Sequence, residues 1–192
     1  PGVGPGTRRF VHMATTTTTK NKRKADHGAR LTEEQNAESG FSASETLSEN
    51  LQKVLVDLIE LASQGKQAHW NVVGTNFRDT HLALDEIIEA TREFADTIAE
   101  RMRALHALPD GRSDTVAEST SLPEFPQGEI ATTKVIDLIT VRLEDTVSTC
   151  REVHDDVDEE DPTSADILHA VIEKLEQFAW MISAENRTPR AS

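Results

Sequence analysis

Apolar side chains recur along most of the chain at intervals of three and four residues, the spacing that places them on one face of an α-helix. The first such stretch follows Ser42 to Glu45, a capping-box sequence in which serine and glutamate side chains satisfy the open amides of a helix start. The pattern predicts four long helices, over about 42–71, 77–108, 131–157 and 163–185.

A long connection separates the second and third of these helices. Residues 109–130 contain three prolines, which end helices and favour loops. Residues 114–119 within it predict one or two helical turns, since long connections in compact domains often carry a short element. Two long helices, a long crossover and two further helices are typical of an all-α, ferritin-like four-helix bundle.

Composition agrees with helices and excludes several classes of protein. The 192 residues include 6 Phe, 2 Trp and no Tyr, whereas β-sandwiches are rich in aromatic residues. Cys150 is the only cysteine, which excludes an intrachain disulfide and a cysteine-based zinc site. No apolar run approaches the ~20 residues of a membrane-spanning helix, and residues 13–30 lack the apolar run of an export signal. We therefore expect a cytoplasmic protein with no membrane partner.

Charge divides the chain into a basic arm and an acidic body. Residues 1–30 carry seven basic side chains against Asp26 alone, a net charge of +6, whereas residues 31–192 carry 13 basic and 33 acidic side chains, a net charge of −20. Phosphates attract a basic arm and are repelled by an acidic body, so the arm is either a solubilising tail or a DNA-binding segment, which would place the protein at the nucleoid. The DNA-binding candidates are Lys20, Lys22, Arg23, Lys24 and Arg30.

These patterns divide the chain into three parts. We expect residues 1–41 to be a disordered arm, of which residues 1–12 precede Met13 and resemble sequence upstream of a natural start. Residues 42–186 form the predicted bundle, and residues 187–192 form a short C-terminal tail.

Two pairs of potential metal ligands lie on the second predicted helix. His81 and Asp85 are four residues apart and share one helix face, and Asp96 and Glu100 repeat this spacing. The eleven residues from Asp85 to Asp96 make about three turns, so both pairs lie on the same face. Imidazole and carboxylate groups suit a divalent metal ion, although each pair alone is also typical of a solvated helix face.

The two pairs cannot serve one site in one chain, because eleven residues separate them by ~16 Å along the helix, whereas the metals of a di-metal centre lie ~3.5–4 Å apart. A two-fold axis near the middle of the helix would bring His81 and Asp85 of one chain opposite Asp96 and Glu100 of a second. His69, near the end of the preceding helix, would complete the first half-site. No Glu-x-x-His motif of the kind that ferritin bundles direct into their own core occurs in the sequence.

The chain resembles a known family around these residues. It is similar to the Dps proteins (DNA-binding proteins from starved cells), or mini-ferritins, through Asp96-x-x-x-Glu100-Arg101 and the string Ala68-His69-Trp70-Asn71-x-x-Gly74-x-x-Phe77-x-x-x-His81-x-x-x-Asp85-Glu86. The resemblance covers about residues 42–186. It implies ferroxidase ligands, which are also the catalytic residues, at His69, His81 and Asp85 of one subunit and at Asp96 and Glu100 of its two-fold mate. Trp70 matches the aromatic residue beside that site, and core packing is the other explanation for it.

The resemblance also implies an assembly and an activity. The assembly is a hollow homo-dodecamer. It oxidises Fe(II), preferably with hydrogen peroxide, at sites that hold two irons each, and it stores the ferric product inside. Acidic residues at the start of the last helix would surround an iron-entry pore, with Asp158, Asp161 and Asp166 as candidates. The alternatives are a non-specific nucleoid-binding protein that acts through the basic arm, and a metal-dependent hydrolase that uses the same site.

Overall fold

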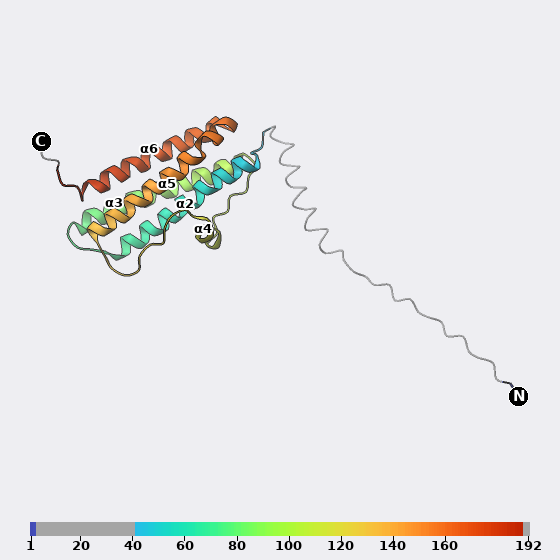
Figure 1. The fold of residues 1–192 in the computed structure, drawn as a ribbon, viewed down its shortest axis with the longest axis horizontal. Helices are drawn as coiled ribbons and strands as arrows, with labels where there is room; N and C mark the ends of the chain where they lie inside the picture. Colours follow the sequence, from blue (N-terminus) through green and yellow to red (C-terminus); the bar gives the residue numbers. More distant parts are fainter. Residues whose placement is uncertain (3–40, 190–192) are drawn as a thin grey trace. The chain divides into compact units, whose positions relative to one another are not determined.

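The computed structural model describes residues 1–2 and 41–189, and the residues from Phe41 onward form one compact unit. Four long helices of this unit lie side by side (Figure 1). They are α2 (Glu45–Asn71), α3 (Phe77–Ala104), α5 (Thr132–Glu160) and α6 (Pro162–Ala184). The predicted all-α bundle is therefore confirmed. Among the helices of the described residues, none combines the length and apolarity that crossing a bilayer requires.

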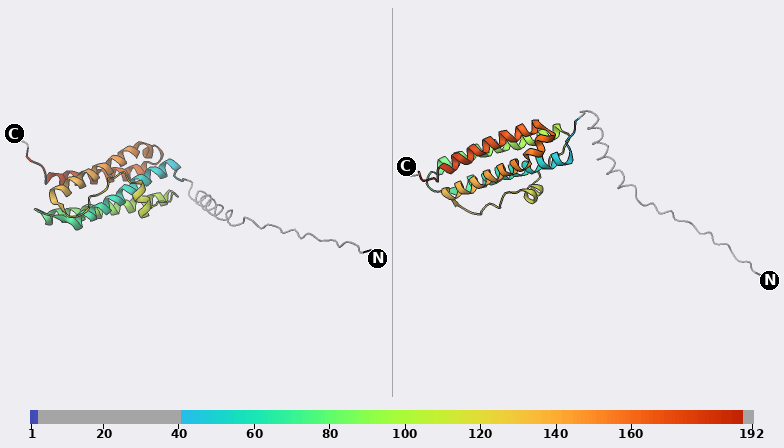
Figure 2. Two further views of the ribbon diagram at one scale, coloured as in Figure 1. Left: turned by 60° about the horizontal axis from the view of Figure 1, so that its bottom comes forward. Right: turned by 45° about the horizontal axis from the view of Figure 1, so that its top comes forward.

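The helices contact one another in the cyclic order α2, α3, α6, α5 (Figure 2). Short connections join α2 to α3 and α5 to α6, so each of these pairs is antiparallel. The long crossover after α3 returns the chain to the end of the bundle where α2 finishes, and α5 starts there. This connectivity is that of a ferritin-like bundle, in which one crossover is long.

The crossover holds the predicted short helix, α4 (Ser113–Ser119), and ends in a pairing that the sequence pattern did not predict. Two-residue strands β1 (Val72–Val73) and β2 (Ile130–Ala131) pair in parallel, with Val72 opposite Ile130. Gly74 follows β1 with a φ of 122°, a conformation that favours glycine. The pairing fixes the start of α5 beside the end of α2.

Several helix ends differ from the sequence-based expectation, and α5, for example, ends at Glu160, three residues later than predicted. The N-cap of α2 is Ser44 rather than Ser42, and its hydroxyl accepts a hydrogen bond from the amide of Leu47 at 3.0 Å. Glu160, at the far end of α5, accepts hydrogen bonds from the amide and hydroxyl of Ser44, so the cap is completed by a residue distant in sequence. In addition, α3 ends at Ala104, four residues earlier than predicted, because His106 adopts a left-handed conformation with φ 64°.

The core of the bundle is aliphatic, and two buried polar side chains fasten the crossover to it. Asp57 is 1% exposed and accepts hydrogen bonds from Ser121 Oγ at 2.6 Å and Thr149 Oγ1 at 2.7 Å. Arg142 is 2% exposed and donates to the carbonyl oxygen of Pro123 at 3.1 Å. Buried polar groups are stable only when hydrogen-bonded, so these contacts fix the crossover's position.

Candidate metal centre

Two helices and the turn between them bring three predicted ligands together. His69 lies in the last turn of α2, whereas His81 and Asp85 lie one turn apart near the start of α3. Residues 72–76 reverse the chain, so the antiparallel helices place His69 opposite the other two side chains. A hairpin of helices thus assembles ligands that are up to 16 residues apart in sequence.

The ligand atoms of this triad, which consists of His69, His81 and Asp85, all lie within 4.8 Å of one another. His69 Nε2 is 2.9 Å from Asp85 Oδ2, and the two imidazole rings are 3.5 Å apart at their centroids. Within the described part of the chain, no other group of three or more such residues converges in this way.

The triad has unmet capacity for binding. The Nδ1 atoms of His69 and His81 are buried and have no hydrogen-bond partner among the described residues. The nitrogen that His69 directs at Asp85 is Nε2, so this is the imidazole atom that the geometry offers to a metal ion. Two imidazoles and one carboxylate are donors suited to borderline divalent ions such as Fe²⁺, so the residues fit the metal that the sequence predicts.

Lys66 is a member of the site that the sequence pattern did not single out. Its Nζ lies 2.9 Å from Asp85 Oδ1. This hydrogen bond is the largest cause that lowers the pKa of Asp85; the contact with His69 adds to it, and partial burial opposes both. Lys66 is three residues before His69 and so lies on the same face of α2, which is the signal that marks it. The lysine keeps Asp85 ionised and occupies one of its oxygens.

Asp96 and Glu100 lie outside the triad. Both are exposed on α3, 11 and 15 residues beyond Asp85. The ~16 Å between Asp85 and Asp96 leaves them too far away to bind the same ion within one chain. Trp70 is 70% exposed, so core packing within the chain does not explain it.

A groove of about 490 Å³ adjoins the triad on the same two helices. Lys66 and Trp70 line it from α2, and Arg92 and Ala95 line it from α3. Ala95 is the neighbour of Asp96, so the groove extends from the triad toward the second pair of predicted ligands. This face therefore carries both pairs and an exposed tryptophan.

The three pore candidates differ in their surroundings. Asp161 is 8% exposed, caps α6 by accepting from the amide of Ser164, and pairs with Arg101 at 2.7 Å. Burial alone would raise the pKa of Asp161, but the hydrogen bonds from Ser164 and Arg101 outweigh burial and lower it. Asp161 thus has a structural role, whereas Asp158 and Asp166 are exposed and remain candidates for a pore.

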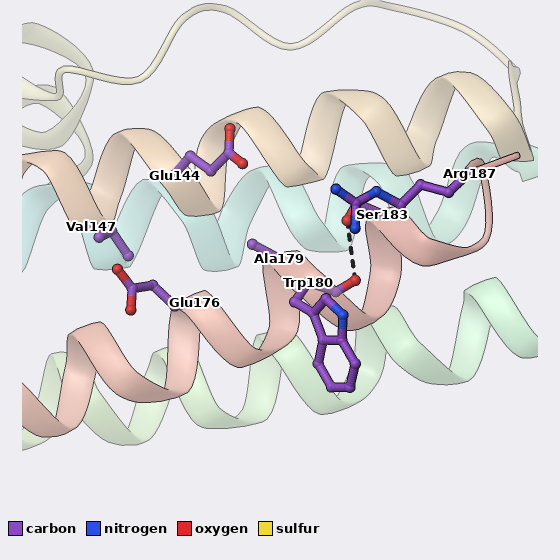
Figure 3. A pocket seen from close by; sticks show the side chains of 7 residues that line it. All are labelled: Glu144, Val147, Glu176, Ala179, Trp180, Ser183 and Arg187. Atoms are coloured by element: carbon purple, nitrogen blue, oxygen red, sulfur yellow. Dashed lines mark hydrogen bonds between the residues drawn. The ribbon is translucent and has the colours of Figure 1, made fainter. Parts of the chain in front are cut away.

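A second groove, of about 340 Å³, lies between α5 and α6 (Figure 3). Glu144 and Glu176 line it from opposite helices, and Trp180 extends from α6 with 63% of its surface exposed. Its lining residues include no histidine or cysteine, so it is a poorer metal site than the triad. The DNA-binding candidates at positions 20, 22, 23, 24 and 30 (Lys20, Lys22, Arg23, Lys24 and Arg30) lie outside the described residues.

Comparison with known proteins gives the class and then the family. Residues 48–190 match the ferritin-like domain. "DNA protection during starvation protein 2" of Deinococcus radiodurans is 37% identical over 134 residues, which are 70% of this chain and 56% of that protein. The chain thus spans little more than half the length of this relative. "DNA protection during starvation protein" of Agrobacterium fabrum is 33% identical over 135 residues, 70% of this chain and 83% of that protein.

A solved structure agrees with these sequence matches. Dps from Microbacterium arborescens, in its high iron form, superposes with a TM-score of 0.70 at 31% identity, over 76% of this chain and 97% of that one. The bundle has the connectivity of the ferritin-like domain that it matches, so the chain is a ferritin-like protein. The chain belongs to the Dps family of these proteins, and the predicted resemblance is confirmed.

Proposed function

We propose that this protein is a ferroxidase that oxidises Fe(II) with hydrogen peroxide and stores the ferric product, which protects the cell from oxidative damage. The observation that carries the proposal is the triad, whose ligand atoms all lie within 4.8 Å of one another. Two Fe(II) ions each lose one electron, the O–O bond of peroxide breaks, and two protons complete two water molecules. Paired oxidation avoids the single-electron step that releases a hydroxyl radical.

The proposed site is shared between two subunits and holds two irons. His69, His81 and Asp85 bind from one subunit, and Asp96 and Glu100 bind from its two-fold mate. Support comes from the placement of both pairs on one face of α3, too far apart to act within one chain. The exposed Trp70 and the adjoining groove lie on the same face, and exposed apolar surface of this kind is typical of protein interfaces.

Storage requires a closed shell, which we propose to be a homo-dodecamer in the cytoplasm. The related Dps from Microbacterium arborescens has been solved in a high iron form, which supports iron as the cargo here. Iron would enter where Asp158 and Asp166 are exposed at the turn between α5 and α6. Rings of carboxylates at such an entrance concentrate cations.

Peroxide-dependent oxidation of Fe(II) tests the proposal directly. Purified full-length protein is loaded with Fe(II) without oxygen, and peroxide is then added. We expect about two Fe(II) to be consumed per peroxide, little hydroxyl radical by spin trapping, and ferric iron that elutes with the protein. Oxidation at the rate of a protein-free control, with free ferric precipitate, would contradict the proposal. Amide hydrolysis that requires a bound metal, without peroxide consumption, would favour a hydrolase.

We further propose that the basic arm binds DNA without sequence preference, because residues 1–30 carry a net charge of +6 and residues 31–192 a net charge of −20. Replacing Lys20, Lys22, Arg23, Lys24 and Arg30 with glutamine should abolish gel retardation of duplex DNA at low salt and leave iron oxidation unchanged. Retardation by the unaltered protein should weaken steeply with salt, since each phosphate contact releases counterions. The control is Arg187→Gln, which changes an exposed basic residue at the start of the C-terminal tail, outside the arm. Equal retardation of DNA by the unaltered protein, the five-fold glutamine variant and Arg187→Gln would show that the arm does not bind DNA.

A further inference from the structure

His154 of α5 and His169 of α6 face each other. This pair lies on the two helices that do not carry the triad. Their Nε2 atoms are 2.7 Å apart, and their ring centroids are 4.7 Å apart. The His154 side chain is 24% exposed and that of His169 is 58% exposed, so solvent ions can reach them. The two residues are joined through the one-residue turn at Asp161, which holds α5 and α6 antiparallel at this end.

The other ring nitrogen of each histidine faces a carboxylate. His154 Nδ1 lies 3.0 Å from Asp155 Oδ1, and His169 Nδ1 lies 3.7 Å from Asp166 Oδ1. The 3.0 Å contact is a hydrogen bond and favours the tautomer of His154 with the proton on Nδ1, whereas the 3.7 Å contact is too long to fix the tautomer of His169. Carboxylates placed behind imidazoles in this way are the usual outer partners of metal-binding histidines.

His154 therefore presents the lone pair of its Nε2 atom to the Nε2 atom of His169. A neutral His169 with its proton on Nε2 satisfies this 2.7 Å contact as a hydrogen bond, and a metal ion that replaces the proton is the alternative. Two imidazole nitrogens that bind one tetrahedral ion at about 2.0–2.1 Å lie about 3.3 Å apart, so the two rings must separate by about 0.6 Å from their 2.7 Å contact to admit it.

We propose that His154 and His169 form a second metal site, which binds one borderline divalent ion such as Zn²⁺ or Fe²⁺. Imidazole pairs select these ions over Mg²⁺, which prefers oxygen ligands. Asp155, Asp158 and Asp166 lie nearby in sequence on the same two helices and raise the local concentration of cations. Only two protein ligands bind the ion, so water completes the coordination and the ion exchanges readily. The site is independent of the proposed ferroxidase function.

Zinc stoichiometry by equilibrium dialysis of the full-length protein tests this site. We expect His154→Gln and His169→Gln each to bind one Zn²⁺ per subunit fewer than the unaltered protein. The matched control is Glu176→Gln, which removes the Arg151–Glu176 ion pair between the same two helices at 2.5 Å and should leave the stoichiometry unchanged. His81→Ala should lose a different ion, so its loss should add to that of His169→Gln. Mg²⁺ should not compete.

The proposal is overturned if both glutamine variants bind as much Zn²⁺ as Glu176→Gln does. A second measurement covers variants that fail to assemble. A crystal of the unaltered protein soaked in Zn²⁺ should show an anomalous peak between the two Nε2 atoms, and the absence of that peak would equally overturn the proposal.

Discussion

Replacing Asp85 or His81 with alanine is expected to slow the initial oxidation of Fe(II) by about hundredfold or more and to leave the assembly intact. Each change removes one of the three ligand groups that converge within 4.8 Å. Loss of an outer partner of a metal ligand already costs roughly 10–100-fold, so loss of a ligand itself should reach at least the upper end of that range. The measurement is stopped-flow absorbance of ferric iron, with assembly checked by light scattering.

The matched control for this prediction is Glu86→Ala. Glu86 is an exposed carboxylate next to Asp85 in sequence, but it is not part of the triad. Its removal should leave the rate within a factor of two of the unaltered protein. Unchanged rates in both ligand variants would show that the triad does not bind the reacting iron. An equal loss in Glu86→Ala would indicate a general effect of surface charge.

Helical periodicity predicted most of the fold because every long helix buries an aliphatic face. Leu51, Leu58, Ile139 and Leu143, for example, lie within the predicted helices and have no exposed surface. The helix ends were harder to predict, because partners distant in sequence decide them. Glu160 completes the cap at Ser44, and its distance of 116 residues in sequence leaves no local signal.

The triad was predictable for a related reason. Two of its members, His81 and Asp85, are one helical turn apart, so spacing alone placed them together. The facing pair of His154 and His169 gave no such signal, because the two residues are 15 apart and lie on different helices. Their meeting depends on the turn at Asp161. The sequence did not show that Asp161 caps a helix, because it has the same side chain as the exposed aspartates around it.

The same limit applies to the proposed second half of the iron site, because a single chain shows only where Asp96 and Glu100 lie. Both carboxylates are exposed and neither converges with the triad. A symmetric pair of chains explains this arrangement with no change in either subunit. Subunits with defects in opposite halves of the site should therefore complement each other.

Mixed shells of Asp85→Ala and Glu100→Ala subunits are expected to regain about one quarter of the unaltered activity, although each variant alone is expected to be about hundredfold slower or more. In a mixed two-fold pair, one site combines both defects, and the other combines the intact triad of the Glu100→Ala subunit with the intact acids of its mate. Random mixing of equal amounts makes half of the pairs mixed, and half of the sites in those pairs are intact.

The control mixes Asp85→Ala with His81→Ala, whose defects lie in the same half of the site, so no intact site forms. The measurement is the initial rate of ferric absorbance in shells refolded together, with mixing confirmed by native mass spectrometry. No recovery in confirmed mixed shells would exclude a site shared between subunits, and recovery in the control would show that the two variants compensate by another route.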